Sequence, residues 1–282
     1  MTRTEFNDQW NRNFAPLTSE AMPSYDEFQI SERMLEDYLD IFRGYNSRGG
    51  ENIMRYRHPF FDSNGKPLLE KKPCIKFILI GEVRLYPNKP SWNTCKPISG
   101  DINNTYVYDI RHVANTPYLT ALKDAWICPE YKPCPTNKIE TLLCLASKGV
   151  LLLDLFPFAL KTFKTKVKGT KFRDNLNKKN ITRNYWDSPF NPYSIFNRLV
   201  RIESLICKDW DLTLVAPCTI SEFIVNPINR FPPITLVPVG LHPCQFRTTF
   251  HDNKRCKKAW DWRKVAVSSA GGPTMNLIRQ SF

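Results

Sequence analysis

The sequence has no run of some 18 apolar residues, and its first residues contain no apolar stretch followed by a cleavage site. Neither a membrane-spanning helix nor a secretory signal is therefore expected. Low-complexity tracts are also absent, and 42% of the 282 residues are hydrophobic, which excludes wholesale disorder. We expect a soluble, cytoplasmic protein with one compact core, because this length suits a single α/β domain with insertions.

Cys-x-x-Cys pairs are absent, although the chain has nine cysteines. An odd count without such pairs indicates reduced thiols in a cytosolic protein. Cys128, Cys134 and Cys144 come closest to a metal or iron-sulfur site, but their spacing matches no common ligand pattern. We therefore expect no bound metal and no other cofactor.

Acidic residues are in the minority, with 27 Asp and Glu against 40 Lys and Arg, and the formal charge is +13. Such an excess favours a polyanionic partner, with nucleic acid as the leading candidate, because binding releases the counterions of that partner. The alternative is that the charge only aids solubility. We expect DNA as the partner of a monomeric chain.

Apolar runs of strand length alternate with segments of helix length along most of the chain. We expect strands at 75–80, 150–153 and 212–216, with 234–239 and 265–268 as candidates for the remaining ones, and helices at 116–127 and 137–147. This alternation predicts an α/β fold: a three-layer sandwich with a central, mainly parallel four-stranded sheet flanked by helices. Ligands of such sheets lie outside the carboxyl ends of the strands.

The first 70 residues are expected to be an N-terminal helical extension of a single domain that spans residues 1–282. Ser31 predicts the N-cap of an amphipathic helix that ends near Gly44. Its expected buried side consists of Met34, Leu35, Leu39, Ile41 and Phe42. Residues before 30 show no periodicity, so an ordered arm or a loose lead-in is expected there.

Three segments occur in an order that resembles the uracil-DNA glycosylase superfamily: Ile80-Gly81-Glu82, Asn115 to Leu122, and the GVLLLD run within Gly149 to Leu155. In that family the first strand ends in a Gly-containing loop with the water-activating carboxylate. A Pro-containing loop presses on the DNA backbone, and a GVLLLN strand ends in the Asn that grips uracil. The resemblance covers roughly residues 75–282. It implies an enzyme that flips a base out of DNA and excises it, with Thr116 and Pro117 against the DNA.

The sequence departs from the family's pattern at the first and last loops. No proline follows Gly81 before Pro87, although Glu82 directly after the glycine is similar to subfamilies whose loop reads GEAP. The family's His-Pro-Ser motif has two candidate counterparts, LHPC at residues 241–244 and SSAGGPT at residues 268–274. The sequence leaves that choice open.

Glu82 and His242 are the candidate catalytic residues. Cleavage of an N-glycosidic bond builds positive charge on the sugar and negative charge on the base. Glu82 would hold and deprotonate the attacking water, and His242 would donate to the departing base. The alternatives are that Glu82 only accepts hydrogen bonds from loop amides and that His242 is a structural loop residue.

Tyr106 and Tyr108, with Trp92 behind them, are the candidates for stacking on the flipped base. Aromatic residues at alternating positions also occur on the core side of a strand, which is the alternative.

Asp154 stands where the family's GVLLLN strand has Asn. An Asn amide matches the acceptor and N–H donor of uracil, whereas an ionised Asp only accepts and would repel a uracil carbonyl. Asp154 therefore favours cytosine, whose edge offers an amino donor, unless it only caps a following helix or pins the loop. Because a host does not tolerate loss of its own cytosine, a hydroxymethylated or glucosylated cytosine of bacteriophage DNA is expected. By analogy, the chain resembles bacterial defence glycosylases of this superfamily.

The segment from Lys161 to Arg183 holds nine Lys or Arg against one Asp and follows the GVLLLD strand. Interleaved aromatics are typical of surfaces that follow a phosphate backbone. The expected DNA contacts are Lys164, Lys166, Lys168, Lys171 and Arg173. The alternative is a solvated loop without a partner.

Three other functions remain open at this point. The chain would be a conventional uracil-DNA glycosylase of base-excision repair, or a non-catalytic nucleic-acid-binding protein of the same fold. A nuclease or nucleotide hydrolase would need clustered carboxylates for a metal, and the strand exits and the loop after the first offer only Glu82, Asp101, Asp109 and Asp154.

Overall fold

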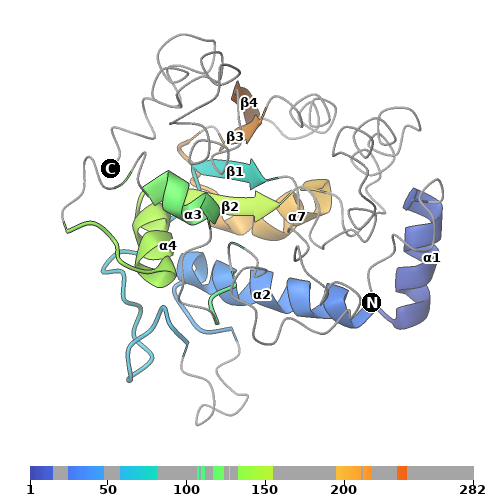
Figure 1. The fold of residues 1–282 in the computed structure, drawn as a ribbon, viewed down its shortest axis with the longest axis horizontal. Coiled ribbons are helices and arrows are strands. Elements are labelled where there is room, and N and C mark those ends of the chain that lie inside the picture. The colour runs from blue at the N-terminus through green and yellow to red at the C-terminus, as the bar shows by residue number, and fades with distance from the viewer. Residues whose placement is uncertain are drawn as a thin grey trace, which may run out of the picture.

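The computed structural model describes residues 1–14, 25–47, 58–81, 107, 109–111, 117–123, 127, 133–154, 195–210, 212–217 and 234–239 (Figure 1). These residues include a four-stranded sheet of β1 (Phe77–Gly81), β2 (Val150–Asp154), β3 (Leu212–Pro217) and β4 (Ile234–Val239). The strand order is β2-β1-β3-β4, and every neighbouring pair is parallel. Together with the helices, this sheet confirms the expected α/β class.

The strands form where the sequence has continuous apolar runs, and all residues of β1 and β2 are buried. The bounds of β4 are those expected, whereas β1 begins at Phe77 because Ile75 makes only an isolated bridge with Ile206. Pro238, which has no N–H, is tolerated because β4 lies at the edge of the described sheet. The candidate strand at 265–268 lies outside the described residues.

The strand order places a topological switch point between β1 and β3. The chain passes from β1 to β2 on one side, and then to β3 and β4 on the other side of β1. Connections from the carboxyl ends of β1 and β3 therefore lead in opposite directions. Crevices at such points are where open parallel sheets bind ligands, so the carboxyl ends of β1 and its neighbours are the place to look for a site.

Helix α2 (Tyr25–Arg43) runs along β2 (Figure 1). Tyr38 is fully buried, and its hydroxyl accepts a hydrogen bond at 3.3 Å from the backbone N–H of Leu152 in β2. Because β2 is an edge strand of the sheet that the described residues form, this contact supplies a partner that those strands do not. All five residues expected on the buried side of this helix are buried.

Among the described helices, none is long and apolar enough to cross a membrane.

The predicted start of α2 at Ser31 is wrong, since the helix begins at Tyr25. The reason is tertiary: Phe28 is buried, and its ring centroid lies 5.2 Å from that of Phe6. Phe6 belongs to α1 (Arg3–Phe14), a helix that the sequence analysis did not assign. A local signal for α1 exists, because Thr2 and Glu5 form a reciprocal capping box between their side chains and backbone amides.

Helix α4 (Lys138–Ser147) begins as expected, with the side chain of Asn137 accepting a hydrogen bond from the backbone N–H of Glu140. The helix ends at Ser147, and Gly149, two residues later, has a φ of 77°, which favours glycine. A Cβ at this position would also lie 2.7 Å from the Cys74 carbonyl oxygen. The glycine of the GVLLLD run is therefore required by the turn from α4 into β2.

The other described helices are α3 (Pro117–Leu122), α7 (Ile195–Ile202) and the 3-10 helix η6 (Glu203–Leu205).

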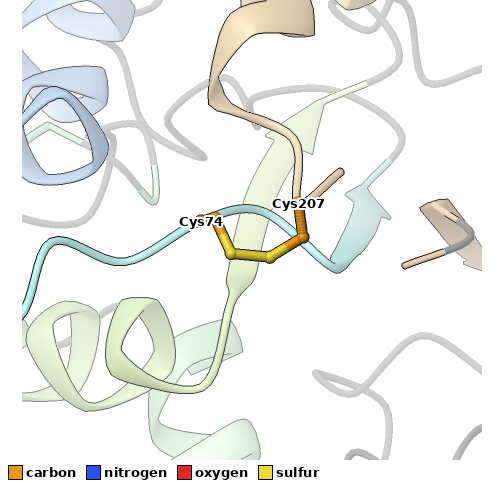
Figure 2. Close-up of a disulfide and its surroundings, with 2 residues drawn as sticks. All are labelled: Cys74 and Cys207. Atoms are coloured by element: carbon orange, nitrogen blue, oxygen red, sulfur yellow. A yellow bond between two sulfur atoms is a disulfide. The ribbon is translucent and has the colours of Figure 1, made fainter. Parts of the chain in front are cut away.

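Cys74 and Cys207 form a disulfide, so the expectation of reduced thiols throughout is wrong (Figure 2). Cys74 precedes β1 and Cys207 precedes β3, and their Cα atoms lie 5.0 Å apart. The backbone also joins the two segments, since the N–H of Cys207 donates to the Ile75 carbonyl at 2.9 Å. Their separation of 133 residues hid this pair from an analysis of local cysteine spacing. Cys134 is disulfide-bonded as well, whereas Cys144 is a buried free thiol.

Candidate functional site

Asp154 and Gly81 face each other at the carboxyl ends of β2 and β1. Asp154 is buried, with 8% of its surface exposed. A Cβ added to Gly81 would lie 2.6 Å from Oδ1 of Asp154, which is closer than real side chains approach. Gly81 has no positive φ, so it is needed here for space. The Asp154 carboxylate therefore lies over the end of β1, where the chain continues to Glu82.

Arg198 of α7 contacts the same strand end at the backbone of Asp154. Its Nη1 donates a hydrogen bond to the Asp154 carbonyl at 2.5 Å, and only 1% of the residue is exposed. A guanidinium stays protonated in proteins, so this contact brings a buried positive charge to Asp154. The end of β2 thus combines a buried carboxylate with a buried cation.

Arg198 was not among the residues expected at the site, although the sequence contains a signal for it. Ile195, Leu199 and Ile202 follow the i, i+4, i+7 spacing of an apolar helix face, and Arg198 occupies the i+3 position of that face. Leu199 and Ile202 are buried, whereas Val200 and Arg201 are exposed. An arginine inside an apolar stripe is a place to expect a specific polar partner, because burying an unpaired charge is costly.

Most of the residues predicted for the site lie outside the described part of the chain. These are Glu82, Tyr106, Tyr108, Thr116, Lys164, Lys166, Lys168, Lys171, Arg173, His242 and the alternative loop at 268–274. Pro117 is described and is the first residue of α3, a position where its fixed φ suits a helix. Asp154 is thus the one predicted base-binding residue with a described environment.

Asp109, one of the carboxylates weighed for a metal-dependent nuclease, is engaged elsewhere. It is fully buried, and its carboxylate accepts from the guanidinium of Arg111 at 2.8 and 3.0 Å. Its backbone carbonyl accepts from Nζ of Lys138 at 3.1 Å. Within the described ranges, no three His, Cys, Asp or Glu residues come together as a metal site would require.

Lys138, at the start of α4, is a second buried cation that the sequence analysis did not single out. Burial lowers the pKa of its amine to about 8, an effect that Asp109 opposes and Arg111 reinforces. The contact with the Asp109 carbonyl ties the turn at 109–111 to α4.

Comparison with protein-family models, with curated proteins and with solved structures found no match. The interpretation of the site at the end of β2 therefore depends on its geometry.

Proposed function

We propose that the protein is a DNA glycosylase that flips a modified cytosine out of DNA and excises it, leaving an abasic site. The observation that supports this proposal most is the pairing of Gly81 with Asp154. It brings the ends of the two strands that carry the resemblance to the uracil-DNA glycosylase superfamily to one edge of the sheet. Parallel sheets bind their ligands at this edge.

The buried Asp154 carboxylate is suited to recognising the edge of a base through hydrogen bonds. A carboxylate accepts hydrogen bonds and donates none, so it matches the amino group of cytosine and opposes the carbonyl that uracil has in its place. Burial strengthens this discrimination, because a base whose edge mismatches the site leaves polar groups unpaired where water cannot compensate. Hydroxymethylated or glucosylated cytosine of phage DNA fits this requirement and spares the host genome.

Catalysis would then fall to Glu82, the residue after Gly81. A carboxylate there would orient the attacking water and stabilise the positive charge that develops on the sugar. His242, Tyr106 and Tyr108 complete the proposed site as donor and stacking residues. We further propose that helices cover both faces of the sheet as a three-layer sandwich and that the monomer binds DNA through the segment 161–183.

We also propose that the protein is located in the cytoplasm, because that is where it would encounter phage DNA. The Cys74–Cys207 disulfide weighs against it, since cytosolic thiols are mostly kept reduced. Alkylation of free thiols in intact cells, followed by mass spectrometry of these two cysteines, decides between the alternatives.

The test is abasic-site formation in duplex DNA that carries one cytosine, 5-hydroxymethylcytosine, glucosylated hydroxymethylcytosine or uracil. Alkali converts each abasic site into a strand break that is counted on a gel. Wild-type protein should release a modified cytosine in the presence of EDTA, whereas Glu82→Gln should bind the same DNA and lose most of the release. Binding without release from any of the four would support a non-catalytic protein, and loss of activity in EDTA would support a metal-dependent hydrolase.

A further inference from the structure

We propose that Arg198 is a positioning residue for Asp154: it fixes the end of β2 so that the carboxylate stays over Gly81. The contacts that carry this inference are independent of activity. Its consequence for base selection rests on the function proposed above.

Burial of Arg198 calls for a specific role. Its side chain is among the largest that are fully buried, and it lies in the apolar stripe of α7. Desolvating a guanidinium is costly, and an apolar residue of similar volume fills such a space without that penalty. Its hydrogen bond to the Asp154 carbonyl joins residues 44 positions apart in sequence and ends at the one charged side chain of β2.

Two features of the structure bear on the position of the Asp154 carboxylate. Its backbone is held by Arg198 at the carbonyl, and its Oδ1 lies in the space that the missing side chain of Gly81 leaves open. Asp154 and Gly81 also form the last pair of the β1–β2 register. Without the arginine, the strand end has one anchor fewer and the carboxylate can move away from Gly81.

This geometry predicts coupling between positions 81 and 198 that unfolding experiments detect. Gly81→Ala should lower the urea midpoint of the wild type, because the new methyl group meets Oδ1 of Asp154. In the Arg198→Met variant the Asp154 carboxylate can move away from residue 81, so Gly81→Ala should lower the urea midpoint less than it does in the wild type. Such non-additivity is the signature of two residues that act on one shared group.

Arg201 provides the matched control on the same helix. It lies one turn away and forms ion pairs with Glu32, at 2.5 Å, and with Glu36 of α2, so its loss disturbs α7 without touching Asp154. Gly81→Ala should cost as much in Arg201→Met as in the wild type. Should Arg198→Met fail to fold, Arg198→Lys keeps the charge but loses the planar fork, and should show the same coupling in weaker form.

Base release tests the consequence for selectivity. Arg198→Met should lower kcat for the preferred base about 10- to 100-fold, with little change in KM, and lower the preference over uracil. In an Asp154→Ala background the same substitution should have no further effect on selectivity, because Arg198 acts through Asp154.

The outcomes separate the two proposals. Coupling between 81 and 198 in a protein that releases no base would support the positioning role and overturn the proposed function. Base release with purely additive effects of Gly81→Ala and Arg198→Met, or with a full effect of Arg198→Met in the Asp154→Ala background, would overturn the positioning role alone.

Discussion

At the amino ends of the strands, covalent and main-chain contacts join the elements, whereas at the carboxyl ends a buried charged side chain lies over a glycine. The amino edge has the Cys74–Cys207 disulfide and the tight approach of Gly149 to the Cys74 carbonyl. The carboxyl edge has Asp154, held by Arg198 and accommodated by Gly81. The contrast indicates that the amino ends of the strands maintain the fold, and it leaves the carboxyl ends as the place of the proposed recognition site.

The two motif glycines illustrate the same contrast. Gly149 combines a φ of 77° with a backbone neighbour that cannot move aside, so any side chain strains the turn itself. Gly81 lacks a positive φ and is crowded only by a carboxylate, so a side chain there displaces a polar group. A change at residue 149 should therefore act on stability alone, whereas a change at residue 81 should act on both stability and the position of the Asp154 carboxylate.

Removal of the disulfide should have the largest effect on stability. Cys74→Ser together with Cys207→Ser frees a loop of 133 residues, for which chain entropy predicts a loss of about 4 to 5 kcal/mol. Urea unfolding of the double variant and of the wild type, both without reductant, measures the difference. A change below about 1 kcal/mol would show that the neighbouring backbone hydrogen bonds suffice to hold the amino edge.

Gly149→Ala should be the next in size, with a loss of about 2 to 4 kcal/mol from left-handed strain and the clash with the Cys74 carbonyl. Gly65→Ala is the matched control, because Gly65 has a φ of 76° and nothing within 4 Å of the added Cβ. Strain alone should then cost about 1 to 2 kcal/mol at residue 65. Equal losses at both positions would contradict the close approach at residue 149.

Lys138 shows what burial of a cation costs in free energy of unfolding in this fold. Because burial lowers the folded-state pKa to about 8, below the usual 10.5, the unfolded chain binds more protons between these values. The free energy of unfolding should therefore rise with pH from about 8 to 10.5, by about 2 to 3 kcal/mol. Lys138→Met should lack this rise in a series of urea titrations, and an identical rise in the variant would assign it to other groups.

Neutralising the basic segment should have the smallest effect, and on binding only. If Lys164, Lys166 and Lys168 contact phosphates, replacing all three by Gln should make the slope of log affinity against log salt shallower by up to about 2.7. Fluorescence anisotropy with labelled duplex DNA measures this slope. A slope equal to that of the wild type would leave the segment without a role in DNA binding.

The elements that the sequence predicts well are those with strong local signals. The end of β2, the bounds of β4 and the extent of α4 follow from apolar runs and helix signals within a few residues. The early start of α2 depends on packing of Phe28 against Phe6, which periodicity does not contain. The disulfide likewise depends on a contact between residues 133 positions apart.

The candidate site follows the same rule. The exit of β2 at Asp154 could be assigned from the chain alone, because a polar residue closes a buried apolar run. Its opposition to Gly81 depends on the parallel register, and its anchor Arg198 comes from a helix that the sequence analysis did not assign. The position of Arg198 in an apolar stripe can be recognised in the sequence, but its partner is known only once α7 is placed against β2.

The preference of the protein for one base is the measurement that decides whether Asp154 reads cytosine. Initial rates of base release from modified cytosine and from uracil, in otherwise identical duplexes, should differ by up to about 10⁴-fold in favour of the cytosine. Asp154→Asn, which restores an amide, should shift that ratio toward uracil. Robust uracil release by the wild type, with no release from any modified cytosine, would contradict the assignment and make the protein a conventional uracil-DNA glycosylase.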